Sequence, residues 1–181
     1  DLPEELRDEI RMIDKAIAGL APTSTLPSTP AITLPDNGLA TARTVPLPQP
    51  QSVVAFMGKG IKFEDPDYFP AFVLNYTFGG GGFESRLMKK LREEKGLTYG
   101  TYSSVSDGEY LQSWSGSGQT KNESAGEFLA GIKAEMAAIA ATGVTAVELE
   151  DAKLYLTGSY PMAFDSNAKI AGQLMTVRQR N

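Results

Sequence analysis

Apolar residues recur at helical spacing over residues 3–20, and Pro3 suits the first turn of a helix. The apolar stripe consists of Leu6, Ile10, Ile13, Ile17 and Leu20. Residues 21–37 carry four prolines among serine and threonine, a composition that is typical of an extended linker. The pattern therefore predicts an isolated helix, a linker, and a domain that begins near residue 38.

Strand patterns occur in the first half of this domain and again in its middle. Residues 38–46 alternate weakly, and residues 52–57 form a nearly unbroken apolar run, which predicts a strand covered on both faces. Residues 98–105 and 109–116 alternate around Asp107-Gly108, a dipeptide that strongly favours a hairpin turn. We expect this pair of strands to be antiparallel.

Helix signals separate and follow the strands. The predicted starts are the caps Asp65 or Asp67, the capping boxes Thr120-x-x-Glu123 and Thr145-x-x-Glu148, and the caps Asp165 or Ser166. Gly143 should end the second of these helices, and Pro161 should end or kink the third. The order of elements predicts an α+β fold, a two-layer sandwich with helices packed on one face of a mostly antiparallel sheet.

The stretch GGGGFESRLMKKLREEKGLTYG, residues 79–100, is the most informative part of the chain. At about 100° per residue, a helix that follows the glycines has one apolar stripe with Arg92 at its edge. The stripe consists of Phe83, Leu87, Met88 and Leu91. Gly96 suits the left-handed conformation that ends helices, so Tyr99 should begin a strand a few residues from Arg92. Two hydrogen-bond donors would then share one concave edge.

Each of these features also has a structural interpretation. The glycines of residues 79–82 would suit a phosphate at a helix N-terminus, but no phosphate-binding motif fits them, so a tight turn is favoured. On physical grounds alone, Arg92 would interact with the carbonyls that end its own helix, and Tyr99 would pack on the sheet. The remaining assignments are a solvated face for Lys89, Lys90 and Lys95 among Glu84, Glu93 and Glu94, a core position for Trp114, and caps for Glu123 and Glu148.

Composition limits the possible functions. With 181 residues, 41% hydrophobic and 22% charged, the chain is long enough for one globular domain with a substantial core. A net charge of -5 provides no basic face for nucleic acid, and no apolar run approaches the length of a membrane span. The chain has neither cysteine nor histidine. We therefore expect no disulfide, and no catalytic zinc bound by this chain.

Residues 79–100 resemble a known family. After the glycines come Ser85-Arg86-Leu87 and then Leu91-Arg92-Glu93-Glu94-Lys95-Gly96-Leu97-Thr98-Tyr99. This pattern is similar to the second homologous half of the pitrilysin/insulinase-type zinc metallopeptidases, which include the mitochondrial processing peptidases. The similarity covers roughly residues 30–178, including the later stretch from Gly143 to Leu149.

The resemblance implies a substrate-binding, non-zinc half of an endopeptidase. In such a half, Arg92 and Tyr99 would bind substrate backbone carbonyls opposite a zinc that is held by the homologous half, in the same polypeptide or in a partner subunit. It further implies that residues 1–20 close the preceding half, and that the domain of residues 38–181 is truncated before its last helix and strand. The alternatives are an inactive homologue that serves as an assembly or core subunit and, more distantly, a phosphate-binding enzyme.

Overall fold

The structure is a computed structural model that describes residues 3–20, 41–108 and 110–180. The chain forms two compact units, Asp1–Ile32 and Thr33–Asn181. The first unit contains helix α1 (Glu4–Ile17), which confirms the predicted first helix. Its apolar stripe is exposed: Ile10 is 45% accessible and Ile13 60%. The proline-rich segment of residues 21–37 lies outside the described residues.

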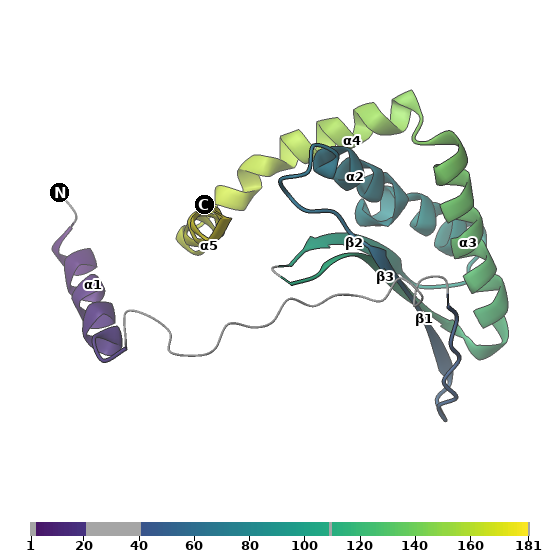
Figure 1. Cartoon of the computed structure of the whole chain (residues 1–181), viewed down its shortest axis with the longest axis horizontal. Coiled ribbons are helices and arrows are strands. Elements are labelled where there is room, and N and C mark those ends of the chain that lie inside the picture. The colour runs from purple at the N-terminus through teal and green to yellow at the C-terminus, as the bar shows by residue number, and fades with distance from the viewer. Residues whose placement is uncertain (1–2, 21–40, 109, 181) are drawn as a thin grey trace. The chain divides into compact units, whose positions relative to one another are not determined.

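The second unit is a two-layer α+β structure, which confirms the predicted fold class (Figure 1). Its sheet has the order β1-β3-β2 and consists of β1 (Gln51–Lys59), β2 (Thr101–Asp107) and β3 (Gln112–Lys121). Both pairings are antiparallel, with β3 in the centre. Helices cover one face of this sheet, and the buried core lies between the two layers.

The predicted hairpin is present, but its strands begin later than expected. β2 and β3 flank Asp107-Gly108, and the Gly108 N–H donates to the Leu111 carbonyl oxygen at 3.1 Å. Residues 98–100 precede β2 and are not part of it. The hairpin turn was predicted correctly because it depends on the residues of the turn itself. The ends of the strands depend on which backbone groups find hydrogen-bond partners in the neighbouring strand, which the sequence pattern does not show.

Two strand predictions were wrong. Within residues 41–46 there is no strand, while residues 38–40 lie outside the described part. The apolar run of residues 52–57 lies in β1, but only one of its faces is covered, and Val53 and Met57 on the other face are 57% and 66% exposed. A short apolar run indicates a strand without showing how many of its faces are covered.

The helices largely follow their sequence signals. They are α2 (Tyr68–Asn75), α3 (Ala125–Thr142), α4 (Ala146–Ser159) and α5 (Asn167–Arg180). Gly143 ends α3 with φ of +69°, and Pro161 lies in the 3₁₀ turn Tyr160–Phe164 directly after α4. The Ser166 hydroxyl accepts from the Lys169 N–H at 3.3 Å in the first turn of α5.

The two predicted capping boxes had different outcomes. The box of Thr145 and Glu148 is present at the start of α4. The box of Thr120 and Glu123 was wrong, because Thr120 belongs to β3 and its hydroxyl donates to the Leu97 carbonyl oxygen at 2.6 Å. A tertiary hydrogen bond thus replaces the local one that the pattern suggested.

Among the described helices, no single one is long and apolar enough to span a membrane. Asn122–Thr142 and Ala146–Phe164 meet the requirement only as a pair, bent by 102°.

The core combines an apolar cluster with one buried polar network. The buried apolar cluster consists of Phe78, Leu87, Leu91, Phe128, Ile132 and Ile139. Trp114 packs against it, as predicted, and its indole N–H donates to Asn75 Oδ1 at 2.9 Å. The Ser103 hydroxyl donates to the same oxygen at 2.7 Å, and Asn75 Nδ2 donates to the Ser103 carbonyl oxygen at 3.3 Å. Asn75 therefore joins α2 to both strands of the hairpin.

The glycines that follow α2 pack directly against this network. A Cβ on Gly79 would lie 2.5 Å from Ser103 Oγ and 2.9 Å from its backbone nitrogen, and a Cβ on Gly80 would lie 2.7 Å from Asn75 Nδ2. Of the four glycines in residues 79–82, only Gly82 has a positive φ, +60°. The run of glycines is therefore explained by close approach to the sheet at its start and by backbone conformation at its end.

Gly79→Ala should lower the free energy of unfolding by about 1–3 kcal/mol, because the added methyl group meets backbone that cannot move away. Gly126→Ala is the matched control. A Cβ at Gly126, in the first turn of α3, meets nothing within 4 Å, so this change should be neutral or stabilise by up to about 1 kcal/mol. Denaturant unfolding of both variants measures the difference, and equal stability would contradict the close packing.

Candidate functional site

The segment that carries the sequence motif begins with a break and continues as a wide helix. Ser85 has extended backbone angles, φ -69° and ψ 152°, and its hydroxyl donates to the Gly82 carbonyl oxygen at 2.8 Å. The helix then starts at Arg86 and has π-helical geometry over Met88–Glu94. Short π-helical segments are rare and often occur at functional sites.

The apolar stripe of this helix is partly as predicted. Leu87, Met88 and Leu91 are buried, with at most 1% exposed. Phe83 was wrongly included in the stripe, since it is 58% exposed. The extended backbone at Ser85 interrupts the helical phase, so positions before and after it cannot be counted on one helical wheel.

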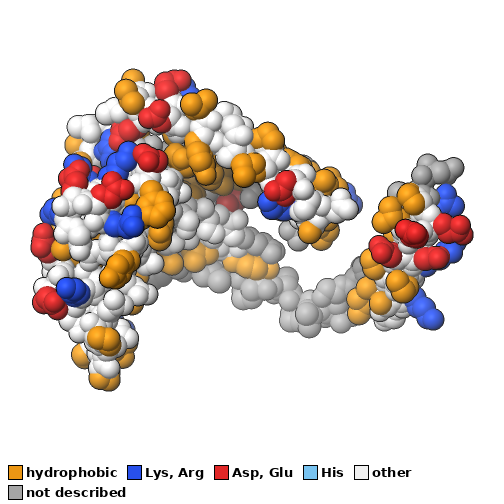
Figure 2. Space-filling view, turned by 180° about the vertical axis from the view of Figure 1, so that it is seen from behind, with side chains coloured by type: hydrophobic (Ala, Val, Ile, Leu, Met, Phe, Trp, Pro, Cys, Tyr) orange, Lys and Arg blue, Asp and Glu red, His pale blue; other side chains and the backbone are white. Residues whose placement is uncertain are grey.

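Most cations of this segment have acidic partners. Lys89 pairs with Glu84 at 2.8 Å, Lys90 with Glu94 at 2.7 Å and Lys95 with Glu127 at 3.5 Å. All three lysine side chains are about half exposed, which confirms the predicted solvated face. Figure 2 shows acidic and basic side chains mixed over the helical part of this unit.

Arg86 makes the strongest polar contact of the segment. Its Nε and Nη2 donate to the two carboxylate oxygens of Glu148, both at 2.7 Å, and Nη2 also donates to the Gly143 carbonyl oxygen at 3.0 Å. The hydrogen bond from Arg86 is the main cause that lowers the pKa of Glu148 to about 2. The predicted role of Glu148 as a helix cap is confirmed. The sequence did not indicate that Glu148 also pairs with Arg86. Glu148 thus ties the motif helix to the turn between α3 and α4.

Arg92 differs from its neighbours. Its guanidinium carbon lies 4.6 Å from the centre of the Phe83 ring, a cation–π contact. Within the described parts of the chain, no carboxylate pairs with Arg92, and its side chain donates to none of the carbonyls that end its helix. Those carbonyls are satisfied by backbone, since the Arg92 carbonyl oxygen accepts from the Gly96 N–H at 3.0 Å. Gly96 has φ of +62°, as predicted.

Tyr99 lies between this turn and β2, and not in a strand as expected. The Thr98 hydroxyl donates to the Gln119 carbonyl oxygen at 2.6 Å and accepts from the Gly100 N–H at 3.1 Å. Because these contacts lie on both sides of it, the backbone of Tyr99 is fixed, while its ring is 90% exposed. Nothing in the sequence indicated that the Thr98 side chain fixes the backbone on both sides of Tyr99, apart from its position next to Tyr99 in the motif.

The structure does not bring Arg92 and Tyr99 into contact. Tyr99 lines a shallow hollow of about 290 Å³ together with Gln51, Tyr102 and Gln119. Arg92 lies at the edge of the motif helix and is not among the residues that line this hollow. The two side chains are therefore separate donors on one short segment, and only a molecule that spans both would connect them.

The available donor set does not suit zinc. The chain has no histidine and no cysteine, the ligands that zinc sites in proteins most often use. Over the described ranges, no group of three or more acidic side chains is placed to hold a metal ion. We therefore derive no chemical step through a metal on this chain.

The sequence of this chain matches a known protein family. A family model described as "Peptidase M16 inactive domain" matches residues 5–156. The chain belongs to this family. The M16 match begins within α1 and includes the motif segment, the hairpin, α3 and most of α4.

Two curated relatives of this M16 domain are bacterial. The "Non-peptidase homolog YmxG" of Helicobacter pylori is 32% identical over 128 residues, which cover 70% of this chain and 29% of the relative. The "Uncharacterized zinc protease YmxG" of Bacillus subtilis is 32% identical over 117 residues, 62% of this chain and 28% of the relative. The M16 domain thus spans less than a third of either relative's length.

Solved structures agree with this assignment. A crystal structure of a peptidase M16 inactive domain from Pseudomonas fluorescens has a TM-score of 0.65 and 38% identity, covering 71% of this chain and 30% of the other. A protease from Helicobacter pylori has a TM-score of 0.74 at 19% identity, covering 95% and 41%. At that identity, the second likeness supports the fold alone.

The pair of Arg86 and Glu148 should make the stability of this M16 domain depend on pH. Because the pKa of Glu148 is depressed in the folded protein, its contribution is present above the ordinary pKa and is lost as the pH falls from about 5 towards about 2. Glu148→Gln should therefore cost about 2 kcal/mol at pH 7 and flatten the loss of stability over this range.

Glu150→Gln is the control, since Glu150 lies on the same helix but pairs at the surface with Lys153. It should leave both the stability at pH 7 and the acid profile nearly unchanged. Unfolding curves from pH 7 to pH 2 test this contrast. Parallel acid profiles for the wild-type chain and the Glu148 variant would show that the pair does not carry the linkage.

Proposed function

We propose that this domain is the substrate-binding, non-zinc half of a zinc-dependent endopeptidase. Arg92 and Tyr99 hold backbone carbonyls of the bound peptide. The zinc, its ligands and the general base belong to a homologous half, in the same polypeptide or in a partner subunit. The match to a model described as a peptidase M16 inactive domain supports this division.

One observation carries the proposal. Among the cations from Arg86 to Lys95 in this described segment, Arg92 is the one without an acidic partner. A guanidinium presents five N–H donors in one plane, and stacking on Phe83 leaves its edges free to bind. A purely structural arginine would be expected to satisfy these donors within the fold. Arg92 therefore suits an external group that accepts hydrogen bonds, such as peptide carbonyls.

Tyr99 complements this arrangement. Its exposed ring is not packed on the sheet, which argues against the structural interpretation of this residue. Because its backbone is already fixed, binding does not also have to order this segment of the chain. The phenol can donate to a carbonyl or to a developing oxyanion, whereas Arg92 cannot act as a base and serves to hold and polarise.

The proposal also assigns the first unit. The amphipathic helix α1 would close the preceding homologous half, where its exposed apolar stripe finds a partner. Residues 21–37 would link that half to the domain that begins near residue 38.

A second candidate function is an inactive assembly or core subunit. The printed name of the Helicobacter pylori relative, a non-peptidase homolog, favours it. Such a subunit has no need for free donors at positions 92 and 99. The two functions thus differ in what substitution of these residues does to peptide hydrolysis by the assembled protein.

In the assembled protein with its zinc-bearing half, Arg92→Ala and Tyr99→Phe should each reduce peptide hydrolysis without changing folding or zinc content. The loss for Tyr99→Phe should reach at most about 10²–10³-fold, the usual effect of removing one donor to developing charge. A loss confined to KM would indicate uniform substrate binding, and an equal loss in kcat and kcat/KM would indicate transition-state binding.

Two matched variants control for general effects. Lys90→Ala removes a paired cation from the same helix, and Tyr110→Phe removes an exposed phenol near the turn of the hairpin. Both should retain full activity. Full activity in Arg92→Ala and Tyr99→Phe as well, with the fold intact, would favour the assembly subunit instead.

A further inference from the structure

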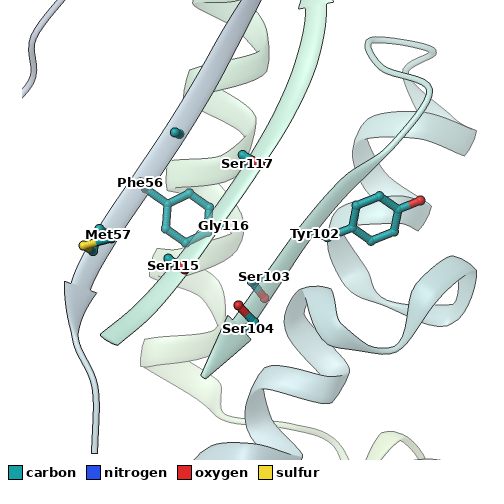
Figure 3. Close-up of a pocket in the computed structure, with 9 residues that line it drawn as sticks. Phe56, Met57, Tyr102, Ser103, Ser104, Ser115, Gly116 and Ser117 are labelled. Atoms are coloured by element: carbon teal, nitrogen blue, oxygen red, sulfur yellow. The ribbon is translucent and has the colours of Figure 1, made fainter. Parts of the chain in front are cut away.

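One face of the sheet is not covered by any of the described helices (Figure 1), and it carries several serine side chains. The register places Ala55, Ser117 and Tyr102 side by side on this face. Two residues away along each strand, and therefore on the same face, it places Met57, Ser115 and Ser104 side by side. Figure 3 shows these side chains on the three neighbouring strands. We call the surface formed by Met57, Tyr102, Ser104, Ser115 and Ser117 the serine face.

The serine face is continuous with the hollow at Tyr99. A larger hollow of about 510 Å³ lies over the serine face itself. It shares Tyr102 and Ser117 with the hollow of about 290 Å³ that Tyr99 lines. A chain that leaves Tyr99 along β2 towards Ser104 passes five residues at about 3.3 Å each, so about five residues of an extended peptide fit along this path.

Neither hollow has a charged lining. Aspartate, glutamate, lysine and arginine make up 22% of the chain, yet among the described residues none of them lines either hollow. A charged group that loses water here would find no ionic partner, which is costly. Apolar groups find Met57 and Tyr102, which are 66% and 51% exposed. Thioether side chains adapt to different shapes.

The serine hydroxyls are available to a ligand. In the described part of the chain, the side chains of Ser104, Ser115 and Ser117 make no hydrogen bond, in contrast to Ser103 on the covered face, which binds Asn75. A hydroxyl both donates and accepts, so it can pair with a peptide N–H, a carbonyl or a neutral polar side chain. The surface can therefore contact uncharged groups, both polar and apolar.

We propose that the serine face is a substrate subsite that binds the peptide residues next to the one held at Tyr99 and selects uncharged ones. This inference rests on the proposed function, because the path begins at Tyr99. It adds a substrate class: peptides whose segment on one side of the bound residue is small, polar without charge, or apolar.

The test is a titration of the 181-residue chain with blocked ten-residue peptides, followed through backbone amide NMR signals. The first peptide contains Ser, Ala and Gln alone, and two others carry Lys or Asp at two adjacent central positions. The uncharged peptide should shift the signals of Tyr99, Ser104, Ser115 and Ser117. Each charged peptide should bind about tenfold more weakly.

A charge placed on the serine face should reverse this preference. Ser115→Asp should strengthen binding of the Lys peptide at least tenfold relative to the Asp peptide. Ser106→Asp, on the same strand face but outside both hollows, is the control and should shift the ratio much less. An equal shift in both variants would show a general field effect and overturn the subsite.

The remaining outcomes separate the two proposals. Shifts at Arg92 and Tyr99 with equal affinity for all three peptides would overturn the subsite and leave the proposed function in place. Absence of shifts at Arg92, Tyr99 and the serine face would count against both. Concentration-dependent shifts on the serine face without peptide would identify a second copy of the chain as its occupant, and would also overturn the subsite.

Discussion

The position of Arg92 and Tyr99 depends on how residues 79–100 are anchored at both ends. At the start, Gly79 lies so close to Ser103 that no side chain fits between the helix and the sheet. Arg86 then binds Glu148 and the Gly143 carbonyl oxygen, which ties the segment to the turn between α3 and α4. At the end, Thr98 joins it to β3. Local packing and hydrogen bonds thus hold the segment without using Arg92 or the Tyr99 ring.

This anchoring separates structural polar groups from available ones. The lysines of the segment and Arg86 each form an ion pair with a glutamate. These side chains therefore serve the stability or solubility of the helix. Among the described residues, Arg92 contacts the face of the Phe83 ring and no carboxylate, and this contact holds the guanidinium without occupying its hydrogen-bond donors. The serine face extends the same distinction. Its hydroxyls make no hydrogen bond within the described part of the chain, whereas those of Ser103 and Thr98 bind other parts of the fold.

Local signals predicted local features well. Gly96, Gly143, Asp107-Gly108 and the box of Thr145 all act within a few residues of their own position, and each was confirmed. Predictions that needed tertiary information failed. Thr120 was expected to cap a helix, but its hydroxyl binds the Leu97 carbonyl oxygen. The apolar run in β1 was expected to be covered on both faces, but one face is exposed. Likewise, π-helical geometry and the pairing of Arg86 with Glu148 have no local signature. The motif pointed to Arg92 and Tyr99 as candidates, and the structure adds that Arg92, unlike the cations around it, has no acidic partner among the described residues.

A double-mutant cycle tests the central claim, that Arg92 and Tyr99 grip one substrate segment. It compares kcat/KM for the assembled protein with Arg92→Ala, with Tyr99→Phe and with both changes together. Since the two side chains do not touch each other, any coupling must pass through the peptide that they share. We predict a combined loss smaller than the sum of the single losses, by about 0.5–3 kcal/mol. Losses that add to within about 0.5 kcal/mol would show that the residues act independently and would contradict the account.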